Sequence, residues 1–207
     1  MKKNLLVVTI SCVLCLFAGG CSTMAKLVFG IDEIKEFRED RCHSFLQEAQ
    51  QFMPCTQIIS DSATYIQAVF MDTTDADMLH HRVQPVQILF FDGDSLIFYH
   101  ISCYAQSGAF TVDWNHYHSF DRFPPSPNVV PDTAGIMTLG RYSELYPALA
   151  PQTRYTVVIF YSNVLRKVSM KAVRAVSGCL KGHEADCRVV LVNTDQFFTA
   201  AFNGSSK

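Results

Sequence analysis

The sequence predicts an α/β domain built on one mixed β-sheet flanked by helices. The runs 156–161 and 188–193 are almost wholly apolar, as buried parallel strands are, and an amphipathic segment lies between them. Two further β-rich runs, 86–91 and 96–103, flank the segment Asp92-Gly93-Asp94-Ser95. This segment favours a hairpin turn, because glycine accepts the positive φ that such turns need. A parallel βαβ unit and an antiparallel hairpin together give a mixed sheet.

The composition supports one folded domain and argues against a nucleic-acid partner. Of 207 residues, 49% are hydrophobic and 17% are charged, a balance that excludes intrinsic disorder. Seventeen basic and 19 acidic side chains give a net charge of −2. Without a basic excess, the surface has little means of neutralising phosphates, and we predict no nucleic-acid partner.

The N-terminus resembles the signal of a bacterial lipoprotein. Basic residues 2–3 precede the apolar run 5–17, which is too short to span a bilayer but suits a signal-peptide core. Small residues 18–20 follow, and then Cys21, the residue that such signals acylate after cleavage. Ala18 stands where leucine is commonest in these signals. An ordinary secretory signal is the alternative.

The resemblance to a lipoprotein signal implies a domain order and a location. Residues 1–20 are the signal peptide, 21–30 a tether and 31–207 a single exported domain. Acylation of Cys21 attaches the chain to a membrane by its lipid. We therefore expect a lipid-anchored protein of the bacterial cell envelope. Ser22 favours the outer membrane by analogy with enteric bacteria.

The exported domain divides into three parts where the composition changes. They are a helix-strand-helix-hairpin part at 31–104, a proline-rich insertion at 105–153 and a βαβ part at 154–207. Six of the eight prolines fall within the insertion, which is too long for an ordinary connection and indicates a functional or covering loop. Its aromatic residues supply surface for packing: Trp114, Tyr117, Phe120 and Phe123.

Hydrophobic spacing predicts the remaining elements. Apolar residues recur at helical spacing in 31–52, a short strand is expected at 56–59, and 63–80 suits a helix or a strand. The insertion has room for a short helix at 139–149. Apolar positions across 165–179 predict the crossover helix of the βαβ part.

Two segments resemble the thioredoxin-like family. Residues 83–95 are similar to its proline loop and terminal hairpin, with Pro85 as the candidate cis-proline, and 156–193 are similar to its strand-helix-strand half. Since the hairpin comes first here, the resemblance implies a permuted or two-part arrangement in one mixed sheet. Family members with thiol chemistry place Cys-x-x-Cys where a strand enters a helix. Here that position holds 162–165, Ser-Asn-Val-Leu, and no Cys-x-x-Cys follows Cys21, which implies a redox-inactive body.

The cysteines of the exported domain allow several readings. Cys42 and Cys103 lie in apolar patterns and are expected to be inert buried thiols. Cys179 and Cys187 bracket a polar turn, which makes them a candidate disulfide in an oxidising export compartment. The alternatives are two unreactive thiols or a metal site with His183, which lacks a fourth local ligand.

Other signs of chemistry are weak. His116 and His118 share a face if their segment is extended, but a polar surface loop is the simpler reading. The chain has no nucleophile elbow, zinc-protease helix or phosphate-binding glycine loop. We therefore predict no catalytic residue, no metal site and no cofactor.

The sequence favours a binding protein over an enzyme. Its predicted function is that of a lipid-anchored envelope protein whose redox-inactive thioredoxin-like body binds a protein or small-molecule partner. One alternative is a thiol-dependent redox enzyme that uses Cys103 or the Cys179–Cys187 pair. Another is a structural component of the envelope.

Overall fold

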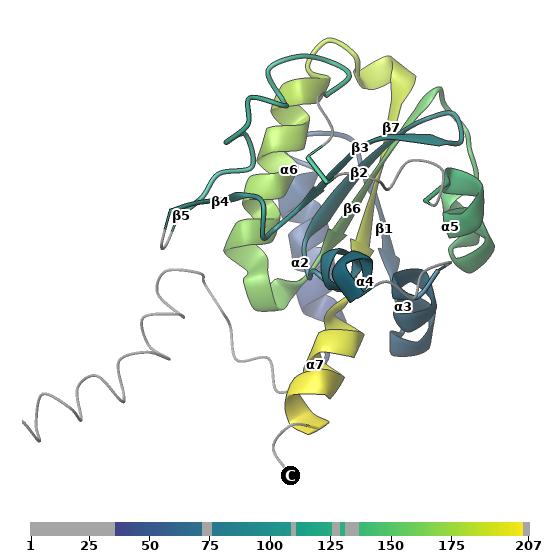
Figure 1. Ribbon diagram of the computed structural model, residues 1–207, viewed down its shortest axis with the longest axis vertical. Coiled ribbons are helices and arrows are strands. Elements are labelled where there is room, and N and C mark those ends of the chain that lie inside the picture. The colour runs from purple at the N-terminus through teal and green to yellow at the C-terminus, as the bar shows by residue number, and fades with distance from the viewer. Residues whose placement is uncertain (1–35, 72–75, 109–110, 126–128, 131–136, 205–207) are drawn as a thin grey trace, which may run out of the picture.

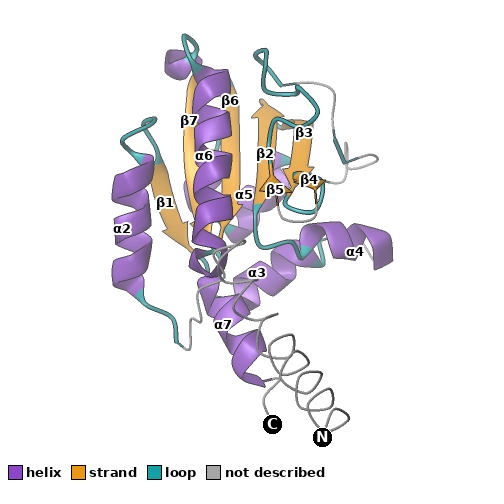
Figure 2. Ribbon diagram, turned by 90° about the vertical axis from the view of Figure 1, so that its left-hand side faces the viewer, coloured by secondary structure: helices purple, strands orange, loops and turns teal. Residues whose placement is uncertain are grey.

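A five-stranded mixed sheet with helices on both faces forms the centre of the protein (Figures 1 and 2). The computed structural model describes residues 36–71, 76–108, 111–125, 129–130 and 137–204. The helices are α2 (Glu39–Ala49), α3 (Ser62–Val69), α4 (Ala76–Arg82), α5 (Leu139–Leu145), α6 (Arg166–Leu180) and α7 (Asp195–Gly204). The strands are β1 (Thr56–Ile59), β2 (Gln87–Asp92), β3 (Ser95–Ile101), β4 (Gln106–Gly108), β5 (Thr111–Val112), β6 (Tyr155–Tyr161) and β7 (Cys187–Asn193).

The sheet joins the two halves that the sequence predicted. Its strand order is β1-β7-β6-β2-β3, which Figure 2 shows in sequence across the sheet. Strands β1, β7 and β6 are parallel, whereas β2 is antiparallel to both β6 and β3. The βαβ part and the hairpin therefore share one sheet, through pairs such as Gln87 opposite Phe160. The α/β fold class is confirmed, and the arrangement is compatible with a thioredoxin-like fold.

Two hydrophobic layers hold helices against the sheet. Helices α2 and α6 cover one face, while α3 and α5 lie on the other (Figure 1). Helix α6 follows the predicted apolar spacing, because Val168, Ala172, Val176 and Cys179 all point into the first layer. Strand β6 is buried along its whole length, as its continuous apolar run predicted.

The proline-rich insertion packs onto both layers. Its first half lies against α6, where Trp114 is buried and donates its indole N–H to the carbonyl of Val168 at 3.1 Å. Phe120 is buried in the same layer, whereas Tyr117 remains exposed. Its second half holds α5, within the predicted helical segment 139–149, and packs on the opposite face. The described parts of the insertion are thus a covering loop.

Some expected elements differ from the observed ones. The helix expected over 31–52 begins only at Glu39, and its first residues lie outside the described part. The ambiguous segment 63–80 holds two helices, α3 and α4, of which the first is capped by the Asp61 carboxylate accepting from Thr64 N at 2.8 Å. Helix α7 was not predicted. The signal peptide and tether lie outside the described residues, and within the described ones no helix is both long and apolar enough to cross a membrane.

Candidate functional site

The carboxyl ends of the parallel strands bring polar residues from distant parts of the chain together. Strand β6 ends at Tyr161 and β7 at Asn193, and these two residues are register partners. After β6 the chain enters a short 3-10 helix, Asn163–Leu165, and then α6. Ser162 caps this turn by accepting from Val164 N at 3.1 Å. In open α/β sheets, this edge is where ligands bind.

A buried carboxylate is the centre of this polar cluster. Asp195 is only 2% exposed, and its Oδ1 accepts from the Ser162 hydroxyl at 2.6 Å and from Asn163 N at 2.8 Å. Its Oδ2 accepts from Asn163 Nδ2 at 2.7 Å and from Asn193 Nδ2 at 2.9 Å. Four donors thus satisfy both carboxylate oxygens. This carboxylate therefore fixes Ser162 and Asn163, the segment between β6 and α6.

A single thiol lies beside this cluster, contributed by α2. Asn163 Nδ2 is 3.8 Å from the Cys42 sulfur. Gln57 Nε2 donates to the Tyr161 hydroxyl at 2.5 Å and to the Cys42 carbonyl at 2.9 Å, which ties α2 and the end of β6 to β1. Burial and, to a smaller extent, the nearby Asp195 charge raise the pKa of the Cys42 thiol to about 12. The thiol is neutral at pH 7 and buried, as the sequence predicted.

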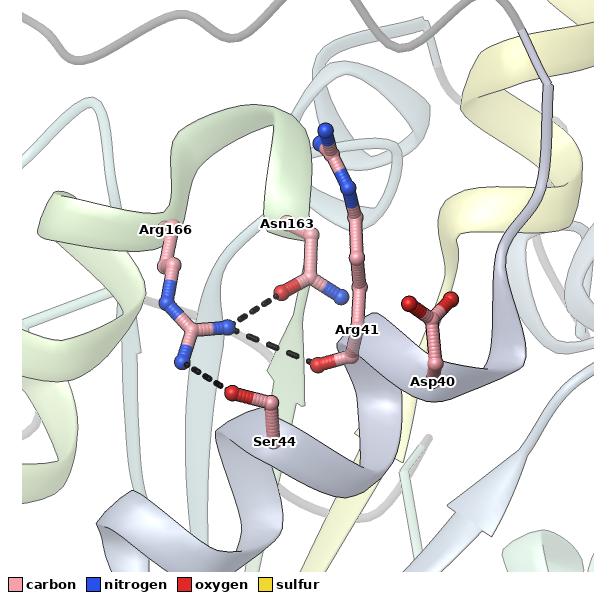
Figure 3. Close-up of a pocket in the computed structure, with 5 residues that line it drawn as sticks. All are labelled: Asp40, Arg41, Ser44, Asn163 and Arg166. Atoms are coloured by element: carbon pink, nitrogen blue, oxygen red, sulfur yellow. Dashed lines mark hydrogen bonds between the residues drawn. The ribbon is translucent and has the colours of Figure 1, made fainter.

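Arg166 connects α6 to α2 above the cluster (Figure 3). Its Nη1 donates to Asn163 Oδ1 at 2.9 Å and to the Arg41 carbonyl at 3.4 Å. Its Nη2 donates to Ser44 Oγ at 3.4 Å and pairs with Glu48 at 2.9 Å. The protons of both terminal nitrogens are therefore engaged within the protein. Arg166 therefore links α6 to α2, and its terminal N–H groups are not available to bind an anion.

A polar pocket of about 310 Å³ opens between α2 and α6. Its lining combines opposite charges and amide or hydroxyl groups: Asp40, Arg41, Ser44, Asn163 and Arg166. The side chains of Asp40 and Arg41 point away from the Arg166 guanidinium in Figure 3. Asp40 pairs with Arg38 at 2.6 Å, and this hydrogen bond lowers the pKa of its carboxyl group.

An apolar pocket of about 330 Å³ lies between α3, α4 and α7. It is lined by Ile66, Phe70, Leu79, Val83 and Phe197, with His80 at its polar margin. Phe70 is 57% exposed and Ile66 is 42% exposed. Among the large hydrophobic side chains that the structure describes, these two are therefore unusually exposed, and they share one pocket. Both α3 and α7 start where parallel strands end, so this pocket lies toward the same edge as the polar cluster.

Pro85 does not form the expected cis-proline loop. Its segment precedes β2 and, by the pairing of Gln87 with Phe160, lies near the end of β6. However, the bond before Pro85 is trans; of the peptide bonds described, the cis one is Phe123–Pro124. In this trans form, the Gln84 carbonyl accepts from Gln87 Nε2 at 2.8 Å and from the Tyr65 hydroxyl at 3.3 Å. The trans form is also the intrinsically favoured one for a bond before proline.

The candidate disulfide is not formed either. Cys179 and Cys187 are both free thiols, and the Cys179 thiol donates to the Arg122 carbonyl at 3.2 Å. Burial raises the pKa of Cys179 to about 12 and that of Cys187 to about 11. Cys103 was expected to be buried, but it is exposed, because β3 ends at Ile101 and Cys103 lies in the turn that follows.

The remaining predictions concern metal ions and lipid. Within the described residues, no three His, Cys, Asp or Glu side chains cluster as metal ligands. His118 instead pairs with Asp121 at 3.0 Å on the surface. The lipid attachment residue Cys21 lies outside the described part of the chain.

Sequence reasoning missed the central role of Asp195. The available signal was a pair of polar segments, 162–163 and 193–195, each directly after a predicted parallel strand. Adjacent parallel strands bring such segments to one edge of the sheet. Comparisons of the chain with family models, with curated proteins and with solved structures found no match.

Proposed function

We propose that this chain is a lipid-anchored protein of the bacterial cell envelope whose redox-inactive, thioredoxin-like body binds an apolar group of a partner or ligand. The observation that carries the binding proposal is the apolar pocket between α3, α4 and α7, with Phe70 and Ile66 exposed in it. Its volume, about 330 Å³, falls within the range of small-ligand sites. It suits one or two apolar side chains of a partner, or a short hydrocarbon chain.

The chemistry at the strand ends supports binding rather than thiol exchange. A dithiol enzyme needs a thiolate at the start of the helix, and here Ser162 and Asn163 occupy that position. Both are tied to the Asp195 carboxylate, which satisfies their donors. The nearby Cys42 thiol has a raised pKa and no accessible surface. The redox alternative that uses the Cys179–Cys187 pair needs a thiolate. The pKa values of both thiols are raised, which disfavours the thiolate at pH 7.

The binding proposal is tested with an apolar probe and one pocket variant. We expect 8-anilinonaphthalene-1-sulfonate to bind the folded full chain and decanoate to displace it. Phe70→Ser removes an exposed aromatic wall, so the dissociation constant for the probe should rise about tenfold or more. Tyr117→Ser is the matched control, because Tyr117 is 46% exposed but lies on the insertion. Equal probe affinity in Phe70→Ser and the native chain would contradict the proposal.

The lipid anchor is tested separately from the pocket. Cys21→Ala should abolish incorporation of labelled palmitate and move the chain from the membrane fraction to the soluble fraction. Cys42→Ala, which removes a buried thiol of the folded body, is the control and should leave both measurements unchanged. Continued membrane attachment of Cys21→Ala without label would show that another feature anchors the chain.

A further inference from the structure

A buried arginine at the end of α4 has no compensating charge among the residues that the structure describes. Arg82 is 2% exposed, and only its Nη1 has a hydrogen-bond partner, the carbonyl of Met71. Its Nε and Nη2 have no hydrogen-bond partner among the described residues. Guanidinium N–H groups removed from water without acceptors cost free energy, and so does an unpaired buried charge.

None of the residues that the structure describes forms an ion pair with Arg82. Two buried phenols lie near its charge, those of Tyr99 and Tyr142. Burial raises the pKa of both phenols, and the Arg82 charge lowers it by less, so both remain neutral at pH 7. Within the described part of the chain, this cation is therefore left without a counterion.

A small cavity lies directly beside the guanidinium. It measures about 10 Å³, about the space that one water-sized occupant takes, and its walls include Tyr65, Gln87, Tyr142 and Phe160 together with Arg82. The Gln87 amide is already used, because its Oε1 accepts from the Tyr99 hydroxyl at 2.7 Å and its Nε2 donates to the carbonyls of Arg82 and Gln84 at 2.7 and 2.8 Å. Among the described atoms around the cavity, Arg82 Nε and Nη2 are buried N–H donors that still require an acceptor.

We propose that this cavity binds one monoatomic anion, chloride in ordinary solution, which accepts from Arg82 Nε and Nη2. The cavity is too small for phosphate, sulfate or a carboxylate ligand, and its lining also includes the apolar side chains of Ala68, Val69 and Phe160. A water molecule would satisfy the two N–H groups but would leave the positive charge uncompensated. This site is separate from the proposed apolar binding pocket, so either one stands without the other.

The anion is tested through its linkage to folding. If unfolding releases one chloride, the unfolding constant of the full chain falls tenfold for each tenfold rise in chloride above the dissociation constant. Gluconate replaces chloride to hold the ionic strength constant, which removes general screening. We expect bromide to substitute for chloride. A native chain whose unfolding constant is the same in chloride and gluconate would overturn the proposal.

Variants assign the effect to Arg82. Arg82→Met keeps an apolar stem of similar length and removes the charge, and such replacements in buried sites are often neutral or stabilising. Its unfolding constant should not depend on chloride. Arg174→Met is the matched control, because Arg174 is on α6, where it lies over the Phe52 ring and away from the cavity. This variant should keep the tenfold dependence on chloride. Equal chloride dependence in Arg82→Met and the native chain would overturn the assignment.

A direct measurement decides the case if Arg82→Met fails to fold. Crystals of the native full chain grown in sodium bromide should show an anomalous scattering peak within hydrogen-bond distance of the Arg82 guanidinium. A water molecule at that place without anomalous signal would overturn the proposal.

Discussion

The substitution Asp195→Asn tests whether the cluster at the strand ends is a fixed structural network. Each carboxylate oxygen of Asp195 accepts two hydrogen bonds, so an amide nitrogen in either position meets two donors. At the Oδ2 position it faces the side-chain amides of Asn163 and Asn193. At the Oδ1 position it faces the Ser162 hydroxyl and the Asn163 backbone N–H.

Neighbouring amides cannot rotate to relieve this conflict without loss. Asn163 Oδ1 already accepts from Arg166 Nη1 at 2.9 Å, and Asn193 Oδ1 accepts from the backbone N–H of Asp195 at 3.1 Å. Flipping either amide would break one of these bonds. The substitution therefore removes at least two hydrogen bonds to a charged group, each of which contributes about 1.5–3 kcal/mol.

We expect Asp195→Asn to lower the free energy of unfolding by about 3–5 kcal/mol. With a urea dependence of about 2–3 kcal/mol per molar, this moves the unfolding midpoint down by roughly 1–2.5 M. The assay is urea unfolding of the full chain followed by circular dichroism. Asp121→Asn is the matched control, because Asp121 is an exposed carboxylate that also accepts from an asparagine and a histidine, and it should cost less than about 1 kcal/mol.

A small effect at Asp195 would refute this reasoning. If the free energies of unfolding of Asp195→Asn and of the native chain differ by less than about 0.5 kcal/mol, the carboxylate does not hold the Ser-Asn segment in place. The start of α6 would then be free to rearrange, and the argument against chemistry at that position would lose its structural basis.

Three other predictions concern buried rings and thiols. Burial lowers the pKa of His100 to about 4 from 6.5, so protons favour the unfolded chain and stability falls by about 3 kcal/mol between pH 6.5 and 4. Urea unfolding across this range should show the loss, and His100→Phe should abolish it. Iodoacetamide at pH 7 should label Cys103 far faster than Cys42, as peptide mass spectrometry would show; fast labelling of Cys42 would contradict its burial. Trp114→Phe loses ring volume and the bond to Val168, and thermal unfolding should show a loss of about 2 kcal/mol, whereas no loss would mean that the insertion is not anchored there.

The sequence predicted the sheet because local patterns determine its strands. The apolar runs of β6 and β7 and the Asp-Gly turn of the β2–β3 hairpin, where Gly93 has φ +59°, need no distant information. Helix α7 was missed because its polar start, Asn193-Thr194-Asp195, suggests a turn. The division of 63–80 into α3 and α4 depends on packing against the sheet, which local spacing does not reveal.

The site was less predictable because its contacts join distant residues. Asp195 meets Ser162 across 33 positions, and Asn163 approaches Cys42 across 121. Nothing near Arg82 in the sequence marks it as buried, since it ends a short helix with two histidines before it. The prediction that Cys103 is buried was wrong, because the apolar pattern of the sequence continues past Ile101, where β3 ends, into the turn that holds Cys103.

The order of the strands along the chain matters less to this site than their order in space. Three parallel strands, β1, β7 and β6, end at one edge, and their last residues connect directly: Ser60 N donates to the Asn193 carbonyl at 3.0 Å, and Thr194 N donates to the Tyr161 carbonyl at 3.0 Å. Helices α3, α7 and α6 therefore start side by side, whichever segment comes first. At the centre of this edge, Asp195 is buried and both of its carboxylate oxygens are hydrogen-bonded. The two pockets lie on either side of it, the polar one against α2 and the apolar one against α4. Exposed Phe70 and Ile66 distinguish the apolar side, which is why we place the binding function there.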